Sequence, residues 1–272
     1  MTPWFGCSTR APSTPHSADR VEPLQLCLDD GFGDAALDTA VARAVLERVD
    51  AGELPATLRL SRPQPVVAFS RQDAAAPGFR HAVEGARDAG FAGVRRLAGG
   101  RAAVFHPGTI AFAWSLPAPR PADGISDRFR TMSDALTEAF RACGADARVG
   151  EVPGEYCAGR WSVNIAGRHK VAGIGQRLLR RAAHTGGVVV VEDAPAIVRA
   201  LTPVYDALEV PWDPAATGAL DLTAAVSWEE IRTAIAEAFA TRFEIAGWEV
   251  DGPTMQRAQA IAHEHQVEDT TW

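Results

Sequence analysis

Short strand-like runs follow one another in this chain instead of alternating strictly with helices, and this order most limits the folds open to it. Between residues 57 and 116, five runs rich in branched and aromatic side chains are interrupted by one helical pattern. A parallel, doubly wound sheet needs a crossover helix after nearly every strand. The sequence therefore predicts an α+β fold in which a mixed, largely antiparallel central sheet is flanked by helices.

Amphipathic spacing and capping residues predict the helices that cover this sheet. Asp34 is a candidate N-cap for a helix whose apolar positions recur at helical spacing as far as Val49. Ser227 and Glu230 form a capping-box pattern that opens another helix. Further helices are predicted around residues 79–89, 125–140 and 254–265. Strands are predicted at residues 57–61, 66–70, 94–97, 102–106, 110–116, 162–166, 171–178 and 187–192.

Length and composition indicate one large folded unit. The chain has 272 residues, of which 47% are apolar and 22% charged, and this is enough for one large hydrophobic core. Residues 1–22 contain several prolines, serines and threonines and are predicted to form a disordered tail. Residues 23–272 are therefore expected to form a single domain that ends in helices.

Charge and cysteine content limit the cellular location and the binding partners that the sequence predicts. The four cysteines have neither CxxC nor metal-ligand spacing, so reduced thiols and no metal site are expected. No apolar run has the length of a membrane span and the N-terminus lacks a secretory apolar region, which predicts a cytoplasmic protein without a membrane partner. The net charge of −7 argues against nucleic acid as a partner, because phosphate binding needs a basic surface.

Lys170 is the single lysine in a chain that has 26 arginines. Arginine supplies surface charge and solubility as well as lysine does, but its guanidinium always keeps its proton. The functional interpretation is that Lys170 holds a nucleophile as a compact donor or moves a proton. The alternative is that a composition drifting toward arginine left one lysine by accident, and the surrounding residues must decide between the two.

Cys157 is the best candidate for a nucleophile among the four cysteines. It lies in residues 154–159 (GEYCAG), which are expected to form a loop before a strand. Cys27 and Cys143 fit the usual role of cysteine as a small buried hydrophobic residue. A turn at residues 166–168 would form a hairpin and bring Lys170 beside this loop, where an ammonium would favour the thiolate.

Gly99 and Gly100 separate two of the predicted strands. Paired glycines let a backbone approach a ligand and leave amides free to donate, although such a pair is most often a hairpin turn. Arg95, Arg96 and Arg101 surround the pair. This segment is therefore either a contact for an anion or a carrier protein, or a solvated rim.

His184 opens a third short segment, in which Gly186 and Gly187 lead into four consecutive valines. The valines predict a buried strand. A histidine in such a place is more often a hydrogen-bonded structural residue than a catalytic base, so only a minor role is assigned to His184.

Together these segments resemble the superfamily of lipoate-protein ligases, octanoyltransferases and biotin ligases, over roughly residues 24–243. The matching pattern is the glycine pair after two arginines, then residues 170–176 (KVAGIGQ), then His184 and Gly186 before a strand. The surroundings of Cys157 and Lys170 are most similar to the octanoyl amidotransferases, which move an octanoyl group between carrier domains through a cysteine thioester. The resemblance implies the catalytic-domain fold of biotin and lipoyl protein ligases.

The resemblance also implies roles for the matching residues. Cys157 would form the thioester, and Lys170 would take a proton from the incoming amine or orient it. The donor would be an octanoyl- or lipoyl-bearing carrier, such as the glycine-cleavage H protein or acyl carrier protein, and the acceptor a lysine of a lipoyl domain. The implied substrate-binding residues are Arg95, Gly99, Gly100, Arg101, His106, Gly173, Gln176, His184 and Gly186. The arginines expected to dock an acidic carrier are Arg177, Arg180 and Arg181, with Arg95, Arg96 and Arg101.

Two other functions fit the same residues. An ATP-dependent lipoate-protein ligase would use Lys170 on an acyl-adenylate, need ATP and Mg²⁺ and leave Cys157 incidental, whereas the transferase requires no cofactor. A non-catalytic paralogue would bind an acyl carrier without turnover. The chain departs from the family at Pro107, where aspartate commonly follows the histidine, and at Ser162, where the amidotransferases tend to carry an acidic residue. The departure at Pro107 bears on the usual ligand contacts of this loop and weakens the ATP-dependent alternative, and the departure at Ser162 bears on donor and acceptor identity.

Overall fold

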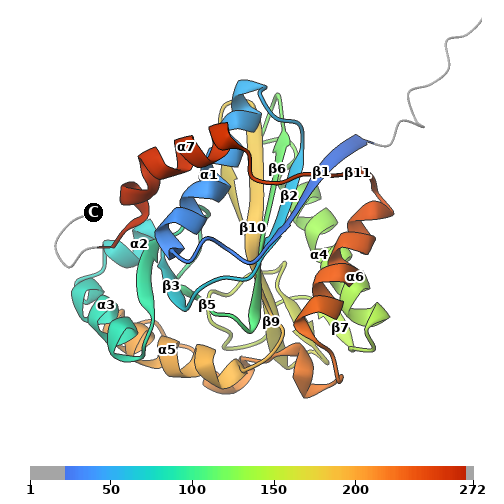
Figure 1. The fold of residues 1–272 in the computed structure, drawn as a ribbon. Coiled ribbons are helices and arrows are strands. Elements are labelled where there is room, and N and C mark those ends of the chain that lie inside the picture. The colour runs from blue at the N-terminus through green and yellow to red at the C-terminus, as the bar shows by residue number, and fades with distance from the viewer. Residues whose placement is uncertain (1–21, 268–272) are drawn as a thin grey trace, which may run out of the picture.

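Two β-sheets and the helices around them make up the fold in a computed structural model that describes residues 22–267 (Figure 1). The predicted disordered tail lies outside the described residues except for Glu22, which begins the first strand. The larger sheet has eight strands in the order β11-β1-β2-β6-β10-β9-β8-β7. These strands are β1 (Glu22–Asp29), β2 (Thr57–Ser61), β6 (Thr109–Pro117), β7 (Ala147–Val149), β8 (Val163–Ile165), β9 (His169–Leu178), β10 (Ala182–Val190) and β11 (Phe243–Gly247).

Neighbouring strands of the large sheet run antiparallel, except that β1 runs parallel to both β2 and β11. The predicted mixed, largely antiparallel sheet is therefore confirmed. β10 begins at Ala182 rather than at Gly187 as predicted. The strand is longer because it pairs with β6 on one side and β9 on the other over this whole length, which places the polar His184 and Thr185 inside the sheet.

A smaller sheet, which the sequence pattern does not separate from the first, has the order β4-β3-β5. Its strands are β3 (Val66–Phe69), β4 (Ala92–Arg95) and β5 (Ala103–Phe105). Pro63 and Pro65 precede β3, and since proline has no N–H to donate, the chain leaves the large sheet there. β4 and β5 both pair with β3, so Gly99 and Gly100 lie in a crossing loop and not in a hairpin turn.

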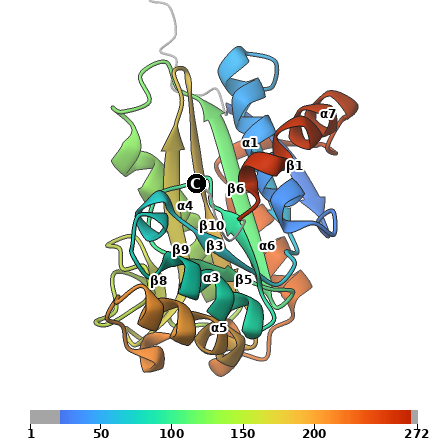
Figure 2. The same ribbon diagram turned by 90° about the vertical axis from the view of Figure 1, so that its left-hand side faces the viewer.

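Helices cover both faces of the large sheet. α1 (Ala35–Ala51) packs on β6 and β10, whereas α4 (Ile125–Ala142) and α6 (Trp228–Ala240) pack together over the other face (Figure 1). The remaining helices are α2 (Arg71–Ala74), α3 (Phe79–Asp88), α5 (Ala194–Ala207), α7 (Gly252–Ile261) and the 3-10 turns η2 (Pro214–Ala216), η3 (Leu220–Leu222) and η4 (Ala262–His265). α3 and α5 lie side by side next to the small sheet (Figure 2), and α7 packs along α1. No helix within residues 22–267 is long and apolar enough to cross a bilayer.

Helix boundaries follow the predicted capping residues where the pattern is local. Asp34 accepts a hydrogen bond from the Leu37 N–H (2.9 Å) at the start of α1, and the predicted capping box opens α6. The sequence pattern does not predict α5, because Pro203 lies inside it and a proline normally ends a helix. In the structure Pro203 packs against Gly85 of α3, where any side chain would collide with it.

Gly187 lies at a close approach between β10 and β9, where an added Cβ would be 1.9 Å from the Gly173 carbonyl oxygen. We expect Gly187→Ala to lower the free energy of unfolding by about 1–3 kcal/mol, because a backbone oxygen cannot move aside without disturbing the strand pair. Urea unfolding followed by circular dichroism measures this. Gly247→Ala is the matched control, since its Cβ would have no neighbour within 4 Å. Equal stability of the two variants would contradict the expectation.

Candidate active site

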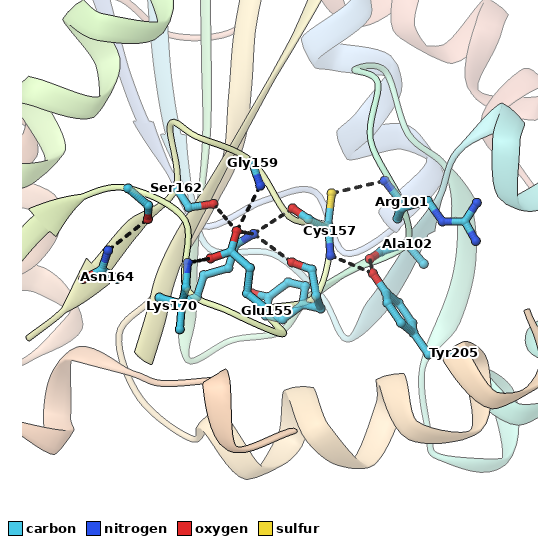
Figure 3. A network of polar contacts seen from close by, with 12 residues as sticks. Arg101, Ala102, Glu155, Cys157, Gly159, Ser162, Asn164, Lys170 and Tyr205 are labelled. Carbon is cyan, nitrogen blue, oxygen red and sulfur yellow. Dashed lines mark hydrogen bonds and ion pairs between the residues drawn. The ribbon is translucent and has the colours of Figure 1, made fainter. Parts of the chain in front are cut away.

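The loop that carries Cys157 connects β7 to β8, and hydrogen bonds to buried side chains hold it in place (Figure 3). Cys157 has a left-handed backbone conformation, with φ of 44°. This conformation costs a residue other than glycine about 1–2 kcal/mol. The contacts around the loop must therefore offset this cost.

Lys170 supplies the central contact of the loop. The predicted turn at residues 166–168 forms the β8–β9 hairpin, which places Lys170 on β9 beneath Cys157. The buried Nζ donates to the carbonyl oxygens of Tyr156 (2.8 Å) and Cys157 (2.9 Å) and to Glu155 Oε1 (3.1 Å). The ammonium thus meets three acceptors, and it bonds the backbone of the cysteine rather than the thiol.

Glu155 is a central residue of the site that the sequence did not single out. Its buried carboxylate accepts hydrogen bonds from the Ser162 hydroxyl (2.6 Å), the Gly159 N–H (3.1 Å) and the Val152 N–H (3.0 Å), besides Lys170. Each carboxylate oxygen therefore has its own donors. A sequence signal existed, because a carboxylate two positions before a candidate nucleophile is a natural partner for the lone ammonium.

The sulfur of Cys157 points toward the loop that carries the glycine pair (Figure 3). Sγ accepts a hydrogen bond from the Arg101 N–H (3.1 Å), and Nη1 of Arg96 lies 3.8 Å from Sγ. Gly100 has φ of 116°, and a Cβ there would be 2.8 Å from Sγ. Position 100 therefore requires glycine both for its backbone conformation and for room beside the thiol.

Tyr205 of α5 joins the two loops. Its hydroxyl accepts a hydrogen bond from the Cys157 N–H (3.0 Å) and donates one to the Ala102 carbonyl (3.0 Å). No sequence pattern identifies Tyr205 as a site residue, because none predicts α5. Arg101 is held in addition by Asp73, whose carboxylate lies 3.2 Å from the Arg101 Nε.

Charges around the thiol favour its ionised form. Burial by itself opposes ionisation, but the Arg96 guanidinium, the Lys170 ammonium and a backbone N–H together lower the pKa of Cys157 below its ordinary value. Burial instead raises the pKa of Cys27 to about 12 and also raises the pKa of Cys143. Cys157 is therefore the most readily ionised of the three thiols within residues 22–267.

Two cavities in this region share part of their lining, and Cys157 lines one of them. The first, of about 430 Å³, is lined by Cys157 and by several residues that the sequence singled out, namely Gly99, Gly100, Lys170, Gly173 and Gln176. The second, of about 120 Å³, is mostly apolar and includes His184 and Gly186. Arg96, Phe105 and Gly187 line both cavities, so the two cavities are neighbours.

Other sequence-predicted residues lie away from the thiol. Arg95 and Arg177 line a third, basic cavity of about 280 Å³, to which Arg96 also contributes. Arg180 and Arg181 are exposed at the turn between β9 and β10.

The two histidines predicted to bind substrate, His106 and His184, have the hydrogen bonds and burial of structural residues. His106 lines none of the three cavities, and its Nδ1 accepts a hydrogen bond from the Gly108 N–H (3.1 Å). His184 lies 3.3 Å from the Ser115 hydroxyl, and burial lowers its pKa to about 4. A neutral His184 fits the apolar cavity that it lines. The described residues contain no group of three side chains suited to hold a metal ion.

The chain belongs to the family of the lipoyl protein ligase A/B catalytic domain. The sequence model of that family matches residues 34–240. The resemblance inferred from the motifs is thereby confirmed.

Two proteins with known names are similar in sequence to about half of this chain. An octanoyl-[GcvH]:protein N-octanoyltransferase of Geobacillus kaustophilus is 29% identical over 157 residues, 58% of this chain and 53% of that protein. A lipoyl-[GcvH]:protein N-lipoyltransferase of Listeria monocytogenes is 26% identical over 152 residues, 56% of this chain and 53% of that protein. The matches thus span about half the length of each relative.

Solved structures support the fold. A crystal structure of lipoate-protein ligase A bound with ATP has a TM-score of 0.74 and 19% identity, with 90% of this chain and 95% of that chain covered. An archaeal bi-partite lipoate protein ligase from Thermoplasma acidophilum has a TM-score of 0.68 and 19% identity, with 90% and 93% covered. At this identity the similarity establishes the fold alone.

Replacing Arg96 tests the charge that acts on the thiol. We expect Arg96→Met to raise the pKa of Cys157, so that alkylation by iodoacetamide near neutral pH slows by several-fold, while the rates converge at high pH where both thiols are ionised. Peptide mapping of the alkylated cysteine over a pH series measures this. Arg177→Met is the matched control, because Arg177 lies in the basic cavity and does not line that of Cys157. An unchanged pH profile in Arg96→Met would refute this account.

Glu155→Gln tests the buried ion pair. A glutamine amide can accept on one oxygen only, so its NH₂ group would face a donor now bonded to the carboxylate. We expect a loss of about 3–5 kcal/mol in the free energy of unfolding, the usual cost of breaking a buried pair by removing one charge. Urea unfolding measures it, with the exposed pair variant Asp146→Asn expected to change stability by less than about 1 kcal/mol.

Proposed function

We propose that this chain is an acyltransferase that moves an octanoyl or lipoyl group from a carrier domain to a lysine of a lipoyl domain through a thioester on Cys157. The observation that carries the proposal is a thiol of lowered pKa that lines a 430 Å³ cavity, and this cavity shares Arg96, Phe105 and Gly187 with an apolar cavity. The names of the relatives, which transfer octanoyl or lipoyl groups and include the GcvH carrier, agree with it.

The reaction would proceed in two balanced steps. The Cys157 thiolate attacks the acyl carbonyl of the donor, the carbon–sulfur bond forms, and the donor leaves as an amine or thiol that carries the proton from Cys157. The lysine amine of the acceptor then attacks the thioester, an amide bond forms, and the proton of the amine restores the Cys157 thiol. An apolar cavity next to the sulfur would bury the acyl chain at roughly 0.8 kcal/mol per methylene.

Lys170 would act by position and charge. Its Nζ already donates to three oxygens, two of them carbonyls of the nucleophile loop. This arrangement suits a fixed donor, so we assign Lys170 the task of holding the backbone of Cys157 and stabilising the thiolate. Of the two functions expected of the lone lysine, these contacts support holding the nucleophile and do not support moving a proton.

The carrier would dock on the basic side of the thiol. Arg177 and Arg95 line the basic cavity that adjoins the Cys157 cavity through Arg96. A carrier with an acidic surface, such as an H protein, a lipoyl domain or acyl carrier protein, would complement this charge. The exposed Arg180 and Arg181 at the β9–β10 turn would extend this surface along the same hairpin.

Intact-mass measurement after incubation with an octanoyl-carrier tests the proposal. We expect the wild type to gain one octanoyl group without ATP, Cys157→Ser to gain none, and Lys170→Arg to acylate at least about tenfold more slowly, because a displaced nucleophile loses its alignment. Acylation of a lipoyl domain is measured in parallel. Transfer that requires ATP and Mg²⁺ and survives Cys157→Ser would favour the ligase instead, and carrier binding without an acyl-enzyme would favour a non-catalytic paralogue.

A further inference from the structure

A row of small residues crosses the large sheet beneath the apolar cavity. Gly175 of β9 is in register with Gly186 of β10, Gly186 with Ala113 of β6, and Ala113 with Arg59 of β2. Residues in register on neighbouring strands point to the same face of a sheet. The floor therefore carries only small side chains on three strands, and an arginine closes it on the fourth. The imidazole of His184 lies over Gly186 and Ala98 lies over Gly175, so these two groups form part of the wall above the row.

The beginning of this row lies beside the thiol. Gly175 lines the Cys157 cavity, and a Cβ at Gly175 would be 3.1 Å from the Gly99 carbonyl oxygen, in the loop that contacts Sγ. The rest of the row, Gly186, Ala113 and Arg59, lines the apolar cavity. A chain attached to the sulfur would therefore run across the strands from β9 toward β2.

The end of the row is a buried ion cluster that consists of Asp29, Arg59 and Asp38. Arg59 is 4% exposed and donates to Asp29 through Nε (2.6 Å) and Nη2 (2.8 Å) and to Asp38 Oδ1 through Nη2 (2.7 Å). Asp38 belongs to α1 and also lines the apolar cavity. Arg59 holds both aspartates, so the cluster cannot move aside to admit a longer chain without breaking an ion pair of the buried arginine.

The distances across the sheet match a medium-length acyl chain. The row spans three strand spacings, which amount to about 14 Å at about 4.8 Å each. Eight carbons joined by bonds of about 1.5 Å extend roughly 9 Å along a zigzag chain. Such a chain starting from the sulfur over β9 would end over β6, with Arg59 next in its path.

We propose that the Asp29–Arg59–Asp38 cluster is the closed end of the acyl pocket and sets the upper limit of chain length at about eight carbons, a limit that octanoyl and lipoyl groups share. The proposal rests on the proposed acyl transfer through Cys157. Asp38 and Arg59 act on specificity and do not touch the reacting atoms.

Opening the end of the pocket is the first test. Wild type and Asp38→Ala, which keeps the Asp29–Arg59 pair, are incubated with hexanoyl, octanoyl, decanoyl and dodecanoyl thioesters of N-acetylcysteamine, and the rate of mass gain on Cys157 is measured. The wild type should react with decanoyl at least about tenfold more slowly than with octanoyl, and Asp38→Ala should reduce this difference severalfold. Asp34→Ala is the matched control, because Asp34 caps the same helix without lining the cavity.

Filling the floor is the second test and does not depend on the ion cluster. Ala113 is half-buried and lines the cavity, so Ala113→Leu should shift the preference from octanoyl to hexanoyl. Equal rates for octanoyl and dodecanoyl in the wild type, or an unchanged length profile in both Asp38→Ala and Ala113→Leu, would overturn the length limit while acyl transfer stands. Absence of acylation with every thioester and with octanoyl-carrier would instead remove the proposed function, and the length limit with it.

Discussion

The buried ion pair of Lys170 and Glu155 is the interaction on which the rest of the site depends. The side chains are 1% and 0% exposed, and the carboxylate collects donors from both ends of the nucleophile loop. A buried pair of this kind is tolerable only when hydrogen bonds satisfy the remaining groups. Here those groups are loop carbonyls and amides, so the same contacts that satisfy the pair also hold Cys157 in its left-handed conformation.

The arrangement of the three oxygens that accept from Lys170 explains why this position is a lysine in a chain whose other basic residues are arginines. Three oxygens converge on one nitrogen, and an ammonium presents three donors from a single point. A guanidinium is a planar fork and would spread its donors. Arg96, by contrast, bridges separate targets: it contacts the sulfur, donates to the Arg101 carbonyl and lines all three cavities. The side-chain shape of each cation therefore matches the arrangement of the groups that it contacts.

Local patterns were sufficient for much of the fold. Strand and helix positions followed from alternation, helical spacing and caps, as at α1 and α6, because these signals act within a few residues. The failures came where a distant partner overrode a local signal. Pro203 remained inside α5 because Gly85 made room for it, and β10 extended through His184 because two strands flanked it.

The sequence alone determined the reactive groups available to this protein, which are a lone lysine, a cysteine in a loop and a glycine pair, and it also determined membership of the lipoyl protein ligase A/B catalytic-domain family. Only the tertiary structure decided how these groups combine. Lys170 pairs with Glu155, and Arg96 and Arg101 of the crossing loop contact the sulfur. His106 lines none of the three cavities. The physical reason is that the pKa of the Cys157 thiol and the shape of the cavities depend on contacts between segments far apart in the sequence, which no local pattern encodes.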